Sequence, residues 1–271
     1  MSNIQIFMTF HTWESIKPFR DIENLVFIDL NVLRHNGGLA SPELAENRFF
    51  LDPPDLEKDK TWVGLCSPRW DQKWPMAPKV RSLASLSGLD MPDRAYAPGL
   101  AQLSKSSSET VYPDLVMGHP GMEKPLEALV REFNLNLPST GNAPWANSFI
   151  VHRDVYLRLL EFWREAFSWA NNVYGLNFPF GFRCLECGHE DQSRIGRYGR
   201  ERLAAFFYER VTMLFFLTVP LDWLKPDQEG IELGRLRKLR SGVQAKMSGK
   251  LSFKRRCTLC GNPLEISAKQ H

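Results

Sequence analysis

Hydrophobic residues in the first part of the chain gather in short runs that end in polar or turn-forming residues. Runs of this length, apolar on both faces, are typical of the buried strands of an α/β sheet. Three of them predict strands: IQIFMTF at 4–10, NLVFIDL at 24–30 and TWVGLCS at 61–67. A later run, WANSFIVH at 145–152, predicts another strand.

The hydrophobic period changes near Asp154, where apolar residues begin to recur every three or four positions. This spacing predicts an amphipathic helix whose apolar side is formed by Val155, Leu159, Trp163, Phe167 and Ala170. A second helix is predicted over GRERLAAFFYERVTMLFF at 199–216. It is apolar over much of its circumference, so we expect it at the centre of the domain.

Two segments carry weaker patterns. The region 68–125 is rich in Pro, Gly and Ser, so we expect long surface loops there, and loops of that length often bind ligands. The most apolar stretch begins at Val211 and is interrupted by Pro220 and Asp222. A membrane-spanning helix needs about 20 apolar residues, so we interpret this stretch as a buried helix and its exit loop.

The composition indicates the size of the domain and the cellular compartment, and it reveals one basic segment. The chain has 271 residues, of which 43% are hydrophobic, enough for one main domain with a small appendage. The N-terminus has no basic region followed by a long apolar run, so we expect a cytoplasmic protein. The net charge is only +3, but residues 234–256 are rich in Lys and Arg and contain no acidic residue. This segment is either a solvated loop or a contact with the anionic inner face of a membrane.

Four of the five cysteines form two matching Cys-x-x-Cys-Gly knuckles. They predict a Zn²⁺ site with four thiolate ligands, Cys184, Cys187, Cys257 and Cys260. Unpaired core cysteines or a redox-active dithiol are the alternatives. Four thiolates fill the coordination shell of zinc and leave no position for a reacting water, so this metal is expected to be structural. Cys66 is left over and is interpreted as an ordinary buried thiol.

The common hydrolase, phosphate-loop and dinucleotide-binding signatures do not occur in this sequence. Four segments do occur in an order that resembles a bacterial family of glycosyltransferases found with capsule and exopolysaccharide genes. In that family an Arg-containing turn ends a strand and is followed by a Tyr-Asp segment, an Asn-Met-Phe-Ile-like strand and an Arg-x-x-Gly-Phe-x-x-Glu-Arg-Leu element. The segments of this chain are VGLCSPRW, VYPDLVMGHP, WANSFIVHRDVYLRLLEFW and RIGRYGRERLAAFFYERV.

The resemblance implies a GT-A-like (Rossmann-like) α/β fold, with a mixed sheet flanked by helices, over residues 1–217. The first knuckle, at about 182–191, looks like an insertion, and residues 218–271 would hold the basic segment and the second knuckle of a small zinc-binding appendage. The implied activity is hexosyltransferase-like: a nucleotide-sugar donor gives its sugar to a polysaccharide, glycan or lipid-linked acceptor in bacterial surface-polysaccharide biosynthesis. The corresponding residues are Arg69, Asp114, Asn147, Glu201 and Arg202.

These residue types suit the donor side of such a site. Ligands of α/β sheets bind beyond the carboxyl ends of the strands, which would place Thr9 and His11 beside the donor. Arg69 would form a bidentate pair with a diphosphate, and Trp70 would stack on a base.

Acceptor activation needs a carboxylate or His within hydrogen-bond reach of the hydroxyl, and Asp114 and Glu201 are the candidates. Each has a structural alternative, in which Glu201 pairs with Arg202 at a helix start, Asp114 begins a turn, and Asn147 satisfies buried backbone groups. The remaining candidates are interpreted first as solvated or capping residues, and they are His11, His119 and His152.

A divalent cation at the donor is left open. Many GT-A enzymes hold Mn²⁺ or Mg²⁺ with an Asp-x-Asp motif, and the nearest approach here is Asp29-Leu30-Asn31. Without such a cation, Arg and Lys side chains would stabilise the departing nucleotide. The alternative function is a zinc-ribbon nucleic-acid-binding module. It is disfavoured because such ribbons hold their cysteines within a few tens of residues and because the basic segment lacks interleaved aromatic residues that stack on bases.

Overall fold

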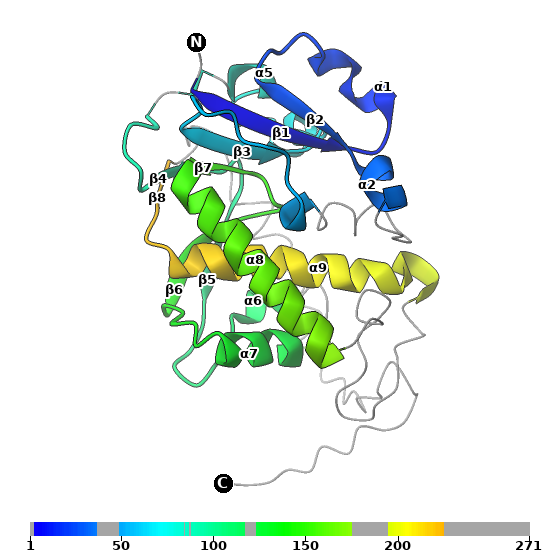
Figure 1. Cartoon of the computed structure of the whole chain (residues 1–271). Helices are drawn as coiled ribbons and strands as arrows, with labels where there is room; N and C mark the ends of the chain where they lie inside the picture. The colour runs from blue at the N-terminus through cyan, green and yellow to red at the C-terminus, as the bar shows by residue number, and fades with distance from the viewer. Residues whose placement is uncertain are drawn as a thin grey trace, which may run out of the picture.

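The computed structural model describes residues 3–36, 49–83, 85–86, 88–116, 123–174 and 195–224. Within them lie a six-stranded sheet and a two-stranded sheet, joined by helices (Figure 1). The prediction of an α/β fold with a mixed sheet flanked by helices is confirmed.

The main sheet has the strand order β2-β1-β3-β7-β4-β8. Its strands are β1 (Ile4–Phe10), β2 (Leu25–Asp29), β3 (Trp62–Cys66), β4 (Arg94–Tyr96), β7 (Phe149–His152) and β8 (Asp222–Leu224). Strands β2, β1 and β3 are parallel, and β4 is parallel to β8. Strand β7 runs antiparallel to both of its neighbours, so it alone of these six opposes the common direction.

Both faces of the main sheet are covered, which explains why its first strands are apolar runs rather than alternating ones. Every residue of β1 is buried. Ile4, Ile6, Met8 and Phe10 belong to a core on one face, whereas Phe7 belongs to the core on the other. The first of these cores is covered by short helices: α1 (Trp13–Ile16), η1 (Lys17–Phe19), α4 (Trp70–Lys73) and α5 (Val80–Leu83).

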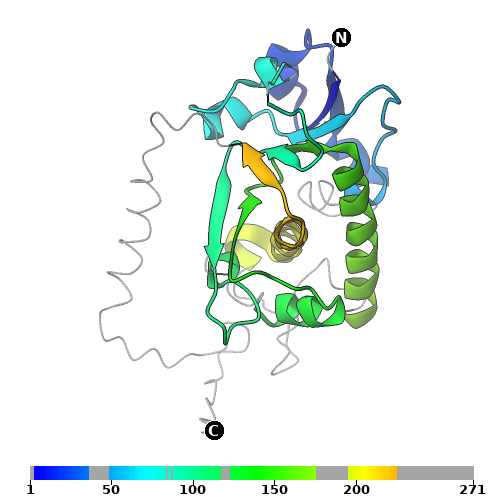
Figure 2. The same ribbon diagram turned by 90° about the vertical axis from the view of Figure 1, so that its left-hand side faces the viewer.

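The other face carries the larger core, which is built around helix α9 (Ile195–Thr218). Figure 2 looks along this helix and shows it enclosed by the remaining elements. They are α7 (Glu123–Glu132), α8 (Arg153–Tyr174), the main sheet, and the second sheet of β5 (Leu100–Ser104) and β6 (Thr140–Pro144). Residues 210–217 of α9 are all buried. The prediction of a central, largely apolar helix is therefore confirmed.

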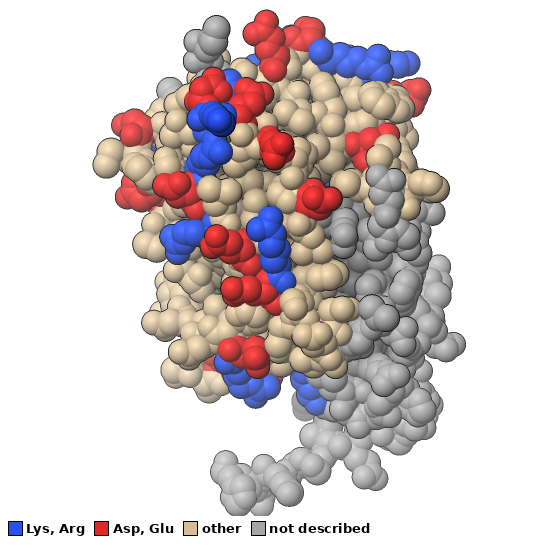
Figure 3. All heavy atoms as spheres, in the orientation of Figure 1, with Lys and Arg blue, Asp and Glu red and all other residues tan. Residues whose placement is uncertain are grey.

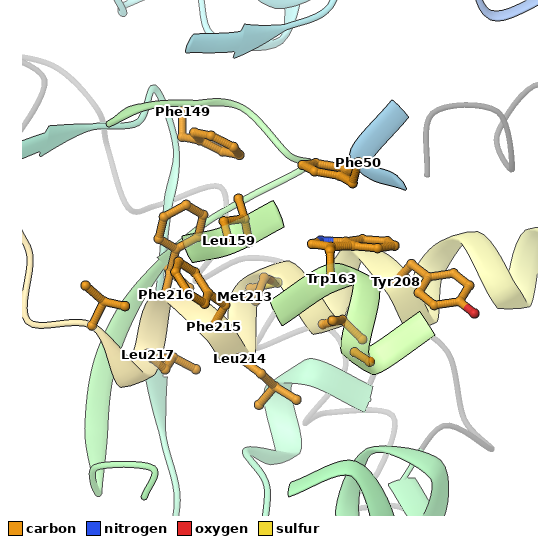
Figure 4. Close-up of a cluster of buried hydrophobic side chains, with 14 of the residues drawn as sticks. Phe50, Phe149, Leu159, Trp163, Tyr208, Met213, Leu214, Phe215, Phe216 and Leu217 are labelled. Carbon is orange, nitrogen blue, oxygen red and sulfur yellow. The ribbon is translucent and has the colours of Figure 1, made fainter. Parts of the chain in front are cut away.

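Aromatic packing joins α8 to α9 within this core (Figure 4). The Trp163 ring stacks on Phe50 with centroids 4.7 Å apart and planes 7° apart, and it lies 4.9 Å from the Tyr208 ring. The Trp163 indole N–H donates to the Thr212 hydroxyl over 2.9 Å. The buried Trp163 side chain therefore also has its one polar group, the indole N–H, hydrogen-bonded.

The expectation of long surface loops over 68–125 is wrong in part. That region contains α4, α5, β4, β5 and α6 (Pro113–Val116), and β4 lies inside the main sheet between β7 and β8. Strand β4 has only three residues. A run that short shows no readable period, and its position depends on pairing with segments far away in the sequence.

The described residues include only part of the predicted appendage and of the segments at the predicted domain limits. Strand β8 lies beyond the predicted boundary at residue 217 and pairs with β4, so the main sheet includes residues 222–224. The four knuckle cysteines, His119 and the basic segment 234–256 lie outside the described residues. Among the helices that the structure describes, none combines the length and apolar character needed to cross a membrane.

Candidate functional site

The strand directions bring several chain segments to one edge of the main sheet, which we name the carboxyl edge. The register places Met8 beside Cys66, Phe10 beside Asp29, and Leu65 beside Phe149. The carboxyl ends of β1, β2, β3 and β4 therefore lie at the same edge as the amino end of β7. The carboxyl edge is formed by residues 9–11, 29–31, 66–69, 96–99 and 145–148.

The ends of β1 and β2 are tied together by hydrogen bonds. The Asn31 side-chain amide donates to the His11 carbonyl over 2.5 Å, and the Asn31 backbone N–H donates to the Asp29 carboxylate over 2.8 Å. His11 is exposed and Thr9 is buried within β1. The structure thus places Thr9 and His11 at the predicted edge and adds Asp29 and Asn31, which the sequence offered only as an imperfect Asp-x-Asp motif.

The two predicted residues after β3 have different surroundings. Arg69 is exposed, and its guanidinium forms no ion pair with any residue in the described ranges, so it is available to an anionic ligand. Trp70 is only 1% exposed, its indole N–H donates to the Pro78 carbonyl over 3.0 Å, and it packs in the core that contains Tyr96. A ring buried in this way cannot stack on a nucleotide without leaving its core, so the structure argues against that role for Trp70.

An aromatic residue that the sequence analysis missed lies just beyond β1. Trp13 is 54% exposed. Its ring meets Phe10 edge to face at 4.9 Å, and the Arg20 guanidinium carbon lies 5.5 Å from the ring centroid. Its position right after His11 and Thr12, at the carboxyl end of a predicted strand, was a signal available in the sequence.

The turn that leads into β7 has an unusual backbone. Ala146 and Asn147 are consecutive non-glycine residues with positive φ, 57° and 49°. The Ser148 N–H donates to the Trp145 carbonyl at 3.3 Å, so residues 145–148 form a hydrogen-bonded turn, and positive φ at both central residues is the pattern of a type I′ turn. Trp145 N–H donates to the Gly99 carbonyl at 3.0 Å, and Ala146 N–H donates to the Glu209 carboxylate at 3.2 Å. The turn is therefore held by the segment that follows β4 on one side and by α9 on the other.

Arg210 joins this turn to helix α6. Its side chain is buried, forms an ion pair with Glu209 at 3.0 Å and donates through Nε to the Leu115 carbonyl at 2.8 Å. Its guanidinium carbon also lies 4.9 Å from the centroid of the Trp145 ring. Asp114, partly buried, is the neighbour of Leu115 in α6. Three separate segments singled out in the sequence, those of Asp114, Asn147 and α9, thus meet around one guanidinium.

The residues of α9 that reach this place are Glu209 and Arg210, not the predicted pair Glu201 and Arg202. The predicted pair lies in the part of α9 whose side chains are not described. The sequence offered a second match eight residues downstream, because RLAAFFYERV spaces Arg202, Phe206, Glu209 and Arg210 as the family element does, with Ala205 in place of glycine. Matching the motif in that register would have found the contact.

Other titratable groups have structural roles. Cys66 is buried as expected, and burial raises the pKa of its thiol, which makes it unreactive. Burial also raises the pKa of the Tyr96 and Tyr156 hydroxyls. The His152 Nδ1 accepts a hydrogen bond from the Asp154 N–H at the start of α8, so the interpretation of His152 as a capping residue is confirmed.

Comparisons of the chain with protein-family models, with curated proteins and with solved structures found no match. Within the described ranges, no group of three or more His, Cys, Asp or Glu side chains is arranged to hold a metal ion.

Proposed function

We propose that this chain is a glycosyltransferase that moves a sugar from a nucleotide-sugar donor to a hydroxyl of a polysaccharide, glycan or lipid-linked acceptor. The observation that carries the proposal is the carboxyl edge itself. Ligands of open α/β sheets bind beyond the carboxyl ends of the strands. Here this edge collects polar groups that follow β1, β2 and β3 and the turn that leads into β7.

The donor nucleotide would lie over the ends of β1, β2 and β3. The Asp29 carboxylate and the Asn31 amide suit the hydroxyls of a ribose, and the exposed Trp13 ring offers a surface for the base. Arg69 would bind the diphosphate, because its planar guanidinium matches phosphate oxygens in pairs. It would also stabilise the charge that develops as the nucleotide leaves.

The acceptor would react beside α6 and the turn before β7. In the transfer step the acceptor oxygen bonds to the anomeric carbon, the bond from that carbon to the diphosphate oxygen breaks, and the hydroxyl proton passes to a carboxylate. Asp114 is the proposed base, and the Glu209 carboxylate is held nearby by Ala146 and Arg210. Glu201 remains a proposed participant on the resemblance alone.

The proposal is tested first by a thermal-shift screen against UDP, GDP, CMP, dTDP and their common sugar conjugates, with and without Mn²⁺. A ligand that binds only the folded state raises the melting temperature. We expect one nucleotide family to do so, and the effect of Mn²⁺ then shows whether the donor site needs a cation. The shift should shrink in Arg69→Ala and persist in Arg81→Ala, an exposed arginine already paired with Asp21. A protein indifferent to every nucleotide would refute the donor site.

The same screen addresses nucleic-acid binding. On the face shown in Figure 3, Lys and Arg side chains are interspersed with Asp and Glu, whereas nucleic-acid-binding faces gather basic side chains. Labelled single- and double-stranded oligonucleotides would be titrated by fluorescence anisotropy at two salt concentrations. Salt-sensitive binding that ignores base sequence, together with no nucleotide response, would favour the binding module over the transferase.

The structural zinc and the membrane contact remain part of the proposal. Zinc content of the purified chain should be one ion per molecule, and Cys184→Ser or Cys260→Ser should lower it together with the melting temperature. Full stability combined with lost turnover would instead mean a catalytic metal. Binding of the full chain to liposomes should rise with anionic lipid and fall with salt if residues 234–256 contact the membrane.

A further inference from the structure

A hollow of about 410 Å³, which we name the α9 hollow, lies at the C-terminal end of α9, where the chain turns toward β8. Figure 2 shows this end of α9 together with β6 and β8. The volume is within the range of small-molecule sites, about 300–1,000 Å³. The lining residues are Pro138, Gly141, Asn142, residues 216–221 and Trp223. None of these described residues carries a charged side chain.

The walls of the α9 hollow are apolar and belong to the packed core. The Phe216 and Trp223 rings are buried and meet edge to face, with centroids 5.5 Å apart. A Cβ at Gly141 would lie 2.6 Å from a methyl group of Leu217, so β6 approaches α9 this closely only because the position is glycine. The shape of the α9 hollow is therefore set by the fold.

The polar groups around the α9 hollow are mostly hydrogen-bond acceptors. The Thr218 hydroxyl uses its proton to donate to a carbonyl of the preceding turn over 2.7 Å. Pro220 has no N–H with which to continue the helical hydrogen bonding to the Phe216 carbonyl. The Asp222 N–H, which would bond the Thr218 carbonyl in a longer helix, donates to the Asp93 carbonyl over 2.9 Å. The carbonyls of Phe216 and Thr218 therefore lack their intrahelical donors.

These surroundings select a neutral ligand that has several hydrogen-bond donors. An anion would meet the negative end of the α9 dipole. A cationic amine could donate, but no lining residue carries a compensating negative charge. A sugar meets both conditions, because its hydroxyls donate to carbonyls and its C–H groups pack on apolar and aromatic walls. The exposed Asn142 amide both donates and accepts, so it can bond further hydroxyls.

Strand β6 connects the α9 hollow to the proposed acceptor side of the carboxyl edge. Beyond the end of β6 the Ala146 N–H bonds the Glu209 carboxylate, and within β6 Gly141 packs on Leu217. Glu209 and Leu217 are eight positions apart in α9, which corresponds to about 12 Å along the helix. A saccharide chain whose end reacts beside the turn can therefore extend along β6 to the α9 hollow.

We infer that the α9 hollow binds a neutral sugar unit of an oligosaccharide, with Asn142 and Thr218 as its polar contacts and Trp223 in its wall. The inference rests on the proposed function in one respect, namely that this saccharide is the acceptor. The reacting hydroxyl would then belong to another unit of the same chain. This deepens the proposed function, because it selects a neutral oligosaccharide among the possible acceptors.

The test uses Asn142→Val with Gln102→Val as the matched control. Gln102 pairs with Asn142 in the register of β5 and β6, is also exposed, and does not line the α9 hollow. Valine suits strand positions, so both variants should fold. The full chain and both variants are titrated by calorimetry with neutral oligosaccharides of two to four hexoses and with uronic-acid oligosaccharides. We expect a neutral oligosaccharide to bind, about tenfold more weakly to Asn142→Val and unchanged to Gln102→Val.

A second variant fills the α9 hollow. Thr218 is exposed at the end of α9, so Thr218→Trp should leave the melting temperature almost unchanged while its ring blocks the sugar. Neutral oligosaccharide binding that survives in both Asn142→Val and Thr218→Trp overturns the inference. The absence of binding to the parent chain overturns it as well, and so does equal binding of the uronic-acid oligosaccharides.

Nucleotide binding, measured on the same proteins, separates this inference from the transferase. It should be unchanged in Asn142→Val and Thr218→Trp, because the donor is proposed to bind over β1, β2 and β3. Nucleotide binding without oligosaccharide binding leaves the transferase standing and overturns the sugar site. Oligosaccharide binding that depends on Asn142, without nucleotide binding, supports the sugar site and refutes the transferase. A dimer that Thr218→Trp dissociates in sedimentation velocity would mean that a second copy covers the α9 hollow, which also overturns the inference.

Discussion

Trp163 in the interior around α9 and Trp74 near the carboxyl edge of the main sheet differ in the surroundings of their indole N–H groups. In the interior, the Trp163 indole N–H is paired with the Thr212 hydroxyl. At the edge, the Trp74 indole N–H has no partner in the described part of the chain. The backbone differs as well, since the edge holds two consecutive residues with positive φ at 146–147. The edge thus combines an unpaired indole with this turn, whereas the interior pairs the Trp163 indole but buries the Tyr156 hydroxyl without a partner among the described residues.

Arg210 stands between the two regions and shows how they depend on each other. It lies on the buried helix, yet its guanidinium contacts Glu209, the Leu115 carbonyl and the Trp145 ring. Helix α9 thus helps to hold the turn at residues 145–148 in place. Substitutions in the interior should therefore change mainly stability, and those at the edge mainly binding.

Removing the central tryptophan of the interior should have the largest effect. Trp163→Ala deletes the ring that stacks on Phe50 and packs on Tyr208, which should lower the free energy of unfolding by about 3–5 kcal/mol. Urea denaturation followed by circular dichroism measures this. Trp13→Ala, which removes an exposed indole, is the control and should change stability much less. Equal losses in the two variants would break the distinction between interior and edge.

Removing Arg210, which connects the interior to the turn before β7, should have the second-largest effect on stability. Arg210→Ala removes the donor to the Leu115 carbonyl and the ion-pair partner of the Glu209 carboxylate, which keeps its hydrogen bond from the Ala146 N–H, at a cost of about 3 kcal/mol. Arg94→Ala is the control, because Arg94 pairs with Asp90 near the surface, where such pairs contribute less than about 1 kcal/mol. Nucleotide-sugar binding should also weaken in Arg210→Ala. If the two arginine variants unfold at the same denaturant concentration, Arg210 does not hold the turn to α9.

Breaking the interior hydrogen bond should have a smaller effect. Thr212→Val keeps the shape of the side chain and leaves the Trp163 N–H unpaired, which should lower stability by about 1–2 kcal/mol without changing ligand binding. Thr218→Val is the matched control, since Thr218 is an exposed residue at the end of the same helix. If Thr212→Val leaves the free energy of unfolding unchanged, the interior tolerates an unpaired indole N–H as the edge does.

The smallest effect is expected from the exposed pair of Asp21 and Arg81, which belongs to neither region. The hydrogen bonds from Arg81 lower the pKa of the Asp21 carboxyl below its usual 3.8. A carboxyl whose pKa is lower in the folded state stabilises the protein above its unfolded value, and that contribution disappears as the pH falls through 3.8 and below. Asp21→Asn should therefore slightly flatten the acid side of a plot of melting temperature against pH. Added salt should reduce the difference between the variant and the parent chain. If the melting temperature of the variant falls with acid in the same way as that of the parent chain does at low salt, the pair of Asp21 and Arg81 contributes nothing to stability.

The elements whose existence was predicted correctly share one property: their pattern is local. Strands β1, β2, β3 and β7 are apolar runs, and α8 and α9 carry the helical period over many turns. The strands β4 and β8 were missed because three residues are too few to show a period, and their places in the sheet come from pairing with each other and with β7.

In the candidate site, too, local patterns predicted some residues correctly, whereas contacts between distant segments could not be predicted. Thr9, His11 and Arg69 could be placed from the sequence, because residues that follow predicted parallel strands must lie at one edge. Trp70 was misjudged because adjacency to Arg69 says nothing about which way a side chain points, and its ring turns into the core. Glu209 was missed because a short motif fits α9 in two registers.

By itself, the sequence determined that this chain forms an α/β domain with buried strands and a central apolar helix, since those properties depend on hydrophobic periodicity over neighbouring residues. Only the tertiary structure decided which polar residues meet. The Ala146 N–H and the Glu209 carboxylate are 63 positions apart in the chain. Their contact requires that the sheet, the turn and α9 are all in place, and no local pattern encodes the distance between them.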